Sequence, residues 1–507
     1  MLSATLLDRA GLADADVARA LGCLKAVPFT GWECEAFAEQ LPLLSGLPER
    51  VPDKPLGECG VLLVGHLLSD LVVQVRTLLA LGARPEAMTV LDKGYPHKLR
   101  QRVEAHLAAL GIAVLPASDV ETAVRLHAAR VMEPSVVIDD GGHVSPVLLT
   151  EVPELLPAFR GLVEQSMSGV EVLESLCSLG ASVDGGDGGD GGPFGSGSGS
   201  GSGSGLRPSD TPASGLPLPV FSVAHSKVKR GIEAHWVAES VVRAIRELLP
   251  REGFDGAPAL VIGFGTVGEQ VAAVLRAQRM RVAVYDSEWP RLLAAHEAGY
   301  LTSPEVPALL DGHQPLLIVS ATGRTGLGGD DLDFLAGDCF VASVSGRASE
   351  IDREGLARRA ERIEDAGRVG VRYVLPRGVV TVLADGLPVN LARSDENPPP
   401  PARQSDLTMA AVVWGACVLA RPDHGFEPGL DVARADDSIA QSGLIERYYR
   451  LYGPVVGAGV RRRSRSRSRP RADDGSDAGT ATSAETGARS AADTGRRTRG
   501  RARISEV

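Results

Sequence analysis

The sequence predicts an α/β protein with two doubly wound domains. Short apolar runs of four or five residues alternate along the chain with longer patterns of helical periodicity, which is typical of parallel strands joined by crossover helices. The chain also has 507 residues, more than a single hydrophobic core usually serves. A low-complexity segment separates two such series of strands and helices, so we expect one domain for each series.

The first series follows an N-terminal segment, residues 1–54, that shows helical patterns. The run "VLLVG" (61–65) predicts a buried strand, and an apolar-periodic helix follows it to about Leu81. The next strands are "AMTVL" (87–91), "IAVL" (112–115) and "SVVI" (135–138), with the helix "HKLRQRVEAHLAAL" between the first two of these. We therefore expect a first α/β domain over residues 55–183.

The second series begins near Leu260 with "LVI". It continues with the runs "RVAVY" (281–285), "LLIVS" (316–320) and "CFVASV" (339–344). The segment "VRYVLPRGVVTVLADGLPVNLA", which comes next, has the pattern of a β-hairpin. We expect a second α/β domain over residues 216–400 and a C-terminal helical segment over residues 401–460.

Two low-complexity segments complete the chain. The Gly/Ser-rich stretch at 184–215 cannot bury apolar surface, and we expect a flexible linker there. The Arg/Ser tail, residues 461–507, begins "RRRSRSRSRPRADD" and is expected to be disordered. Arg–Ser alternation could indicate RNA contact or phosphorylation. We favour a solvated tail with weak nucleic-acid affinity, because Asp473, Asp474 and Asp477 dilute its charge.

Composition excludes several classes of function. The net charge of -11 argues against broad nucleic-acid binding by the folded part. The six cysteines lie far apart without a CxxC pair, so neither a zinc site nor a disulfide framework is expected, and no metal-ligand cluster is visible. No apolar run approaches the length of a membrane span, and the N-terminus lacks a signal-peptide pattern. We expect a cytoplasmic protein that makes no membrane contact.

The stretch "VIGFGTVGEQV" carries the clearest chemistry. Its glycines follow a predicted strand and open a predicted helix, where one allows a tight turn, the next lets backbone N–H groups approach a pyrophosphate, and the third allows close packing. Asp286 ends the following strand, where a carboxylate binds a ribose diol and repels a 2′-phosphate. This pattern predicts a Rossmann domain that binds NAD; the alternative is a Gly-rich turn in a ligand-free domain. The predicted cofactor-binding residues are Gly263, Gly265, Thr266, Val267, Gly268 and Asp286.

Several further motifs, in order along the chain, resemble the NAD-dependent S-adenosylhomocysteine hydrolases. The resemblance covers roughly residues 61–397 and is interrupted by the Gly/Ser segment. It is carried by "VVIDDGG", "LLPAFRGLVEQSMSGV", "SKVKRGIEAHWVAESVVRAI", "VYDSEWPRLLAAHEAGY", "SATGRTG" and "VLADGLPVNLA". It implies a substrate-type first domain, an adenosine-like substrate and a homo-oligomer. In the family's reaction, NAD oxidises the ribose 3′-hydroxyl, a base removes the C4′ proton, the thiol leaves, water adds and the hydride returns.

The resemblance also implies four catalytic residues. Asp140 in "VVIDDGG" matches the family's substrate-domain aspartate, and His66 in "VGHLLSD" falls where the family has a histidine. Lys227 in "HSKVK" best matches the active-site lysine, with Lys229 as the alternative if the register slips, and Asn390 matches an active-site asparagine. Two simpler interpretations stay open: "DDGG" as turn chemistry, and His66 as a structural loop histidine.

Departures from the family pattern argue against its full reaction. The family's second consecutive Glu is Gln165, and the Asp-Asn pair after its lysine becomes Gly231 and Ile232, with Glu233 the nearest carboxylate. Two family histidines become Gly346 and Asn397, and its C-terminal Lys and Tyr, which reach into a neighbouring subunit's NAD site, have no match. Two hypotheses remain: a diverged enzyme that acts on an adenosine-like nucleoside, with full hydrolysis through surrogates such as Glu233 as its strongest form, or a catalytically inactive protein that holds NAD as a sensor or scaffold.

Overall fold

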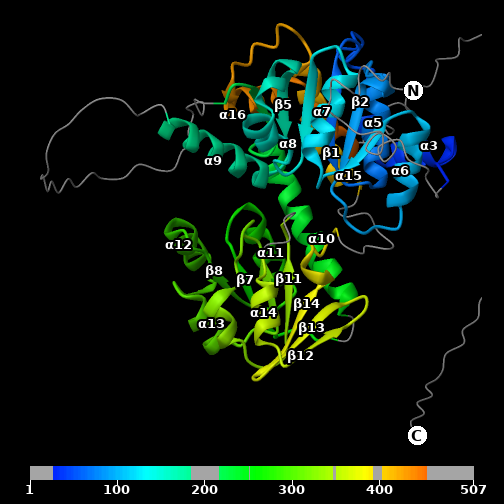
Figure 1. The fold of residues 1–507 in the computed structure, drawn as a ribbon. Coiled ribbons are helices and arrows are strands. Elements are labelled where there is room, and N and C mark those ends of the chain that lie inside the picture. Colours follow the sequence, from blue (N-terminus) through cyan, green and yellow to red (C-terminus); the bar gives the residue numbers. More distant parts are fainter. Residues whose placement is uncertain (1–26, 184–215, 250–251, 346–349, 392–401, 454–507) are drawn as a thin grey trace, which may run out of the picture. The chain divides into compact units, whose positions relative to one another are not determined.

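The computed structural model describes residues 27–183, 216–249, 252–345, 350–391 and 402–453 (Figure 1). The expected Gly/Ser linker and Arg/Ser tail lie outside these residues, as do Gly346 and Asn397. Within the described part of the chain, none of the helices is long and apolar enough to cross a membrane.

The first sheet has seven parallel strands in the order β15-β6-β5-β4-β1-β2-β3. Apart from β15 this is the doubly wound 3-2-1-4-5-6 order, which places a crevice at the carboxyl ends of β1 and β4. The strands are β1 (Gly60–Gly65), β2 (Met88–Asp92), β3 (Ala113–Pro116), β4 (Ser135–Asp139), β5 (Phe159–Glu164), β6 (Pro219–Ser222) and β15 (Gly429–Leu430).

Helices cover both faces of this sheet (Figure 1), because alternate residues of each strand point to opposite sides. In β1, Val61 and Leu63 belong to one hydrophobic core, and Leu62 and Val64 to the other. The first face packs against α3 (Gly31–Gln40), α4 (Pro42–Ser45), α5 (Ser69–Ala80), α6 (Arg100–Ala109), α15 (Ala402–Leu419), α16 (Val432–Gln441) and α17 (Leu444–Tyr452). The second packs against α7 (Val120–Arg130), α8 (Val144–Pro146) and α9 (Met167–Val183).

The second sheet has eight strands in the order β12-β13-β14-β11-β10-β7-β8-β9. Six parallel strands repeat the doubly wound order, and β12 and β13 extend it as antiparallel strands, including the expected hairpin. The strands are β7 (Pro258–Ile262), β8 (Arg281–Tyr285), β9 (Leu301–Thr302), β10 (Leu317–Ser320), β11 (Cys339–Ser343), β12 (Arg362–Asp365), β13 (Gly370–Leu375) and β14 (Gly378–Leu383). The helices are α10 (Ala234–Leu248), α11 (Thr266–Ala277), α12 (Trp289–Glu297), α13 (Val306–His313) and α14 (Arg353–Arg359). The two sheets confirm the predicted fold class.

The first domain takes more of the chain than the sequence patterns indicated. The strand β6 lies beyond the expected boundary at residue 216, yet it pairs with β5 in the first sheet. Phe221 of β6 contacts Phe426 with ring centroids 5.4 Å apart, and helices α15 to α17 join the same core. Four residues are too few to show which sheet a strand joins, so this placement depends on packing alone.

A buried carboxylate connects the N-terminal and C-terminal parts of this domain. Asp406 on α15 accepts hydrogen bonds from the backbone N–H groups of Leu43 and Leu44, at 2.9 and 2.8 Å, and from the Tyr452 hydroxyl at 2.7 Å. Burial raises the pKa of Asp406. The backbone N–H groups in the first turn of α4 therefore find their acceptor in a side chain more than 360 residues later in the sequence.

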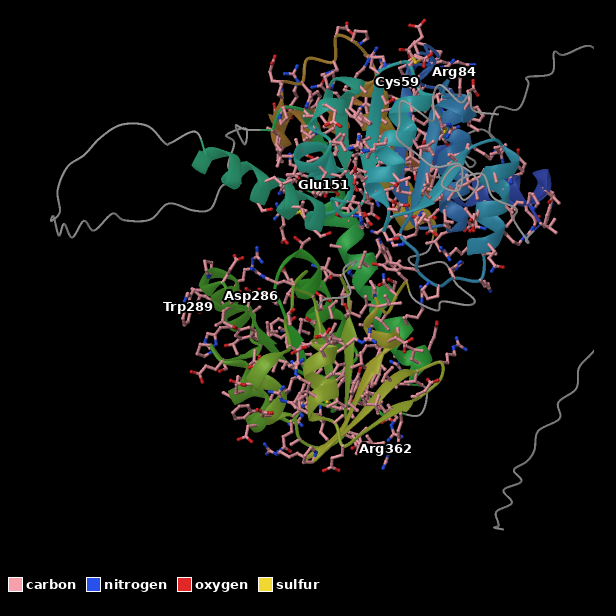
Figure 2. All side chains as sticks on the ribbon, viewed as in Figure 1. Cys59, Arg84, Glu151, Asp286, Trp289 and Arg362 are labelled. Carbon is pink, nitrogen blue, oxygen red and sulfur yellow. The ribbon has the colours of Figure 1, made fainter. Side chains whose placement is uncertain are left out.

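The structure describes the side chains of four of the cysteines. Cys34, Cys59, Cys339 and Cys417 are free and buried, and Cys59 can be located in Figure 2.

We predict that Asp406→Ala lowers the free energy of unfolding by about 3 kcal/mol, because two buried N–H donors and a hydroxyl lose their acceptor. Chemical unfolding of the full chain, followed by tryptophan fluorescence, measures this loss. Asp437→Ala is the matched control, since Asp437 is an exposed aspartate on α16. Equal stability of the two variants would contradict the role assigned to Asp406.

Candidate functional site

The first candidate site is the glycine loop between β7 and α11. Gly263 has φ 96°, and a Cβ there would lie 2.7 Å from the carbonyl oxygen of Ala321. A Cβ at Gly268 would lie only 1.9 Å from the carbonyl oxygen of Gly263. Both positions therefore require glycine, one for the turn and the other for the contact between helix and loop.

Asp286 holds this loop in place. Its Oδ2 accepts a hydrogen bond from the Phe264 N–H at 2.6 Å, and its Oδ1 accepts one from the Glu288 N–H at 2.8 Å. Each oxygen keeps a further lone pair for a ribose hydroxyl. The side chain is buried at the end of β8, where the sequence predicted it.

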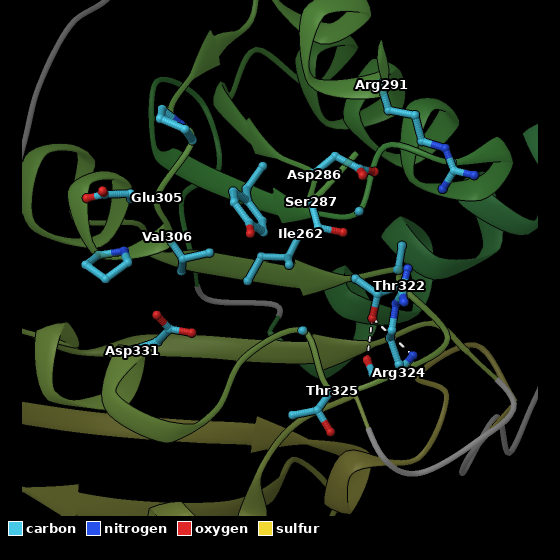
Figure 3. A pocket seen from close by; sticks show the side chains of 17 residues that line it. Ile262, Asp286, Ser287, Arg291, Glu305, Val306, Thr322, Arg324, Thr325 and Asp331 are labelled. Atoms are coloured by element: carbon cyan, nitrogen blue, oxygen red, sulfur yellow. Dashed lines mark hydrogen bonds between the residues drawn. The ribbon is translucent and has the colours of Figure 1, made fainter. Parts of the chain in front are cut away.

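A cavity of about 560 Å³ lies beside the loop and is lined by Gly263, Gly265 and Asp286 (Figure 3). Thr266, Val267 and Gly268 form the first turn of α11 next to it and are not lining residues. Arg291 and Arg324 also line the cavity, and the sequence patterns predicted neither of them. Arg291 lies close to the glycine loop, since a Cβ at Gly265 would lie 3.5 Å from its Nη1. A glycine turn, a helix N-terminus, a ribose-binding acid and two guanidinium groups fit NAD.

A second pocket, of about 220 Å³, lies at the carboxyl ends of strands in the first sheet. The predicted residues His66, Asp140 and Asn390 line it, and so do Lys93, Lys229 and Glu233. His66 follows β1, Lys93 follows β2 and Asp140 follows β4. Because these strands are parallel neighbours, their ends meet at one edge of the sheet.

Lys93, Asp140 and His66 form one charged cluster. Asp140 Oδ2 lies 3.1 Å from Lys93 Nζ and 3.6 Å from His66 Nε2, and the Lys93 side chain is only 6% exposed. Burial opposes ionisation of Asp140, but Lys93, His66 and Lys229 outweigh it and hold its pKa well below the usual range. Burial and the Lys93 charge lower the pKa of His66 to about 3, so its imidazole is neutral.

The two aspartates of "DDGG" have different surroundings. Asp139 accepts hydrogen bonds from the His143 and Val144 N–H groups, at 3.1 and 2.8 Å, and so caps the turn that begins α8. Gly141 and Gly142 have positive φ, as the turn interpretation expected. The first aspartate therefore caps the turn, whereas Asp140 lines the pocket.

Glu164 lies next to this turn and is fully buried. Its Oε1 accepts hydrogen bonds from the Ser166 N–H and hydroxyl and from the Gly141 N–H. Burial and the neighbouring Asp139 raise its pKa well above the usual value, which favours the neutral form. Gln165, which replaces the family's second glutamate, lines the pocket.

The structure corrects the choice of lysine. The Lys227 side chain is 88% exposed and pairs with Asp436 at 3.3 Å, outside the pocket. Lys229, the alternative under a register slip, lines the pocket and pairs with Glu233 at 2.7 Å. Residues two positions apart on a helix point in nearly opposite directions. Residues 227–233 are helical, so Lys227 and Lys229 lie on opposite faces.

With Lys229 in the pocket, two departures from the family pattern, Gly231 and Ile232, fall on other faces of the same helical turn. Gly231 faces open space, and Ile232 packs against the first hydrophobic core, so neither lines the pocket. Glu233 takes the inward position, where the Thr408 hydroxyl donates a hydrogen bond to its Oε2. Asn390 is buried with no partner for its Oδ1, which leaves an acceptor for a bound molecule.

Comparison with known proteins agrees with the resemblance found in the sequence, although no family model matches. The chain is 24% identical to S-inosyl-L-homocysteine hydrolase of Methanopyrus kandleri over 404 residues, which cover 77% of this chain and 84% of that protein. It is 25% identical to adenosylhomocysteinase of Saccharolobus solfataricus over 383 residues, covering 72% and 79% of the two chains. An uncharacterized protein of Mycobacterium tuberculosis is 25% identical, over 75% of this chain and 69% of its own.

Among solved structures, similarity is weaker. Dipicolinate synthase of Bacillus halodurans has a TM-score of 0.34 at 12% identity, covering 72% of this chain and 99% of its own. The NADPH-dependent glyoxylate/hydroxypyruvate reductase of Sinorhizobium meliloti has a TM-score of 0.36 at 13% identity, covering 69% and 92%. The similarity to the hydrolases, together with the fit of the glycine-loop cavity, identifies NAD as the cofactor.

We predict that Gly268→Ala abolishes NAD binding, because the added methyl group would displace the loop at Gly263. Titration calorimetry with NAD measures the loss, and a thermal melt shows whether the chain still folds. Gly312→Ala is the control, since a Cβ at this glycine of the same domain meets nothing within 4 Å. Unchanged NAD affinity in Gly268→Ala would contradict the assigned site.

Proposed function

We propose that this chain, a divergent member of the S-adenosylhomocysteine hydrolase family, is an NAD-dependent enzyme that oxidises the ribose of an adenosine-like nucleoside. The observation that carries the proposal is one pocket holding two lysine–carboxylate pairs, Lys93–Asp140 and Lys229–Glu233. Charged donors and acceptors of this kind bind the hydroxyl groups of a ribose. NAD, when bound, supplies the hydride acceptor.

Lys229 and Glu233 are suited to hold the reacting hydroxyl. Oxidation of an alcohol releases a hydride from carbon and a proton from oxygen, so a base has to lie beside the hydroxyl. The Glu233 carboxylate is fixed from two sides, by Lys229 Nζ at Oε1 and by the Thr408 hydroxyl at Oε2. We assign the hydroxyl contact to this pair, with Glu233 as the proton acceptor.

His66 and Asp140 are suited to a different task. A neutral imidazole can accept or donate a proton, whereas an ionised carboxylate beside a lysine only accepts hydrogen bonds. We therefore assign His66 to proton transfer near the leaving group and Asp140 to holding His66 and the substrate.

Full hydrolysis asks more of the pocket than oxidation does. Elimination of the thiol and addition of water each need a further proton transfer. Gln165 lines the pocket where the family has a glutamate, and an amide cannot ionise. We therefore expect the oxidation step to be retained better than the hydrolysis.

Two further expectations belong to this proposal. We place the protein in the cytoplasm, supported by free, buried thiols among the described cysteines. We also expect a homo-oligomer, on the strength of the family resemblance alone.

The proposal is tested by adding S-adenosylhomocysteine, S-inosylhomocysteine, adenosine or inosine to the NAD-loaded protein. We expect the near-ultraviolet absorbance of reduced nicotinamide to rise with at least one nucleoside, with less released thiol than reduced cofactor. Thiol release equal to turnover would show that the full hydrolysis survives. No absorbance change with any of the four, in protein that still carries NAD, would support an inactive NAD-holding protein instead.

We predict that Lys229→Met lowers the rate of cofactor reduction at least about a hundredfold, because Glu233 loses the cation that pairs with it. Lys227→Met should keep the original rate, since that side chain is exposed. Stopped-flow absorbance measures both variants. A large loss in Lys227→Met with an unchanged Lys229→Met would reverse the assignment.

A further inference from the structure

The substrate pocket contains a buried lysine that the sequence motifs did not indicate. Lys93 is the first residue after β2, and its N–H donates a hydrogen bond to the Gly65 carbonyl at 3.1 Å. This contact fixes the loop after β2 beside the end of β1, which His66 directly follows. The Lys93 side chain is 6% exposed, far less than is usual for a lysine.

The Lys93 ammonium acts on two groups at once. It lies 3.1 Å from Asp140 Oδ2, and His66 Nε2 lies 3.6 Å from the same oxygen. Asp140 alone would draw a proton onto His66, because a carboxylate favours a charged imidazole. Burial is the largest cause that lowers the His66 pKa, and Lys93 acts in the same direction, because its charge disfavours a second cation and satisfies the carboxylate.

Among the charged groups around His66, Lys93 has the largest lowering effect on the His66 pKa. Tyr95 stacks on the imidazole with ring centroids 4.7 Å apart, and His97 lines the same small cavity. His143 acts in the same direction as Lys93 on the His66 pKa but ranks below it. Lys229 acts on Asp140, and Asp70, whose pKa burial raises to about 6, is still mostly ionised at neutral pH, where a carboxylate favours a charged imidazole and so acts against Lys93.

We propose that Lys93 is a positioning residue that keeps His66 uncharged beside an ionised Asp140, so that the imidazole is ready to exchange a proton with the substrate. This inference rests on the proposed function for its catalytic meaning. The charge arrangement itself exists without substrate and can be measured separately. A lysine that merely packs would leave the titration of His66 unchanged when another side chain of similar length replaced it.

The experiment follows the His66 imidazole by NMR in full-length protein with labelled histidine, assigned with His66→Gln. In the wild type we expect no titration of His66 between about pH 5 and pH 8. In Lys93→Met the titration midpoint should rise by about two pH units or more, from about 3 into this range, because only burial and His143 then oppose the attraction of Asp140 for the proton. Lys93→Arg, which keeps the charge, should restore the wild-type behaviour.

Lys98→Met is the matched control, because Lys98 is an exposed lysine in the same loop. If Lys93→Met does not fold, Lys93→Gln replaces it as the neutral variant. An unchanged His66 titration in the folded neutral variant, or an equal change in Lys98→Met, overturns the inference. Absence of cofactor reduction in the wild type defeats the proposed function, whereas the NMR result still decides the role of Lys93.

Where the wild type is active, the pH profile gives a second measurement. The rate of thiol release in Lys93→Met should depart from the wild-type profile on the acid side of neutrality, because His66, which we assign to proton transfer near the leaving group, becomes protonated there in the variant. A profile that only scales down at every pH would indicate a structural role and overturn the inference.

Discussion

The second pocket depends on the parallel pairing of three strands in the first sheet. Gly65 of β1 is in register with Asp92 of β2, and Leu63 with Ile138 of β4. All three strands therefore end at one edge, and the residue or two after each end face the same space. His66, Lys93 and Asp140 meet there although more than 70 residues separate the first from the last. No single loop could hold these groups so close.

Burial at this edge produces two opposite outcomes for neighbouring carboxylates. Asp140 has a lysine at hydrogen-bond distance and stays ionised. Burial raises the pKa values of Asp139 and Glu164, although backbone N–H donors at both carboxyls and His143 at Asp139 act in the opposite direction. A charge in a low-dielectric interior is stable only with a partner of opposite sign. The position of Lys93 therefore determines which carboxylate carries the charge.

The sequence could predict what depends on local periodicity and on glycine geometry. The strands β1 to β4, β7, β8, β10 and β11, the turn at Gly263 and the acid Asp286 all follow from patterns a few residues long. The assignment of β6 could not, since it pairs with β5, a strand more than 50 residues away that the patterns did not indicate. Lys93 was missed for a similar reason: "LDKGYP" has no motif, and only strand pairing places its side chain in the pocket. Which of Lys227 and Lys229 lines the pocket depends on the direction in which one helical turn faces, and the sequence alone does not show this direction.

The direction of the helical turn from Lys229 to Glu233 also changes how many of the departures from the family pattern affect the pocket. Counted along the sequence, the segment after Lys227 loses both polar family residues, at Gly231 and Ile232. In space, the inward positions of the turn hold Lys229 and Glu233, a cation and a carboxylate in contact. The polar losses at 231 and 232 fall on faces that never meet the pocket. Of the departures on described residues, Gln165 is thus the one that alters the charge of the pocket, and on this difference rests our proposal that oxidation is retained better than hydrolysis.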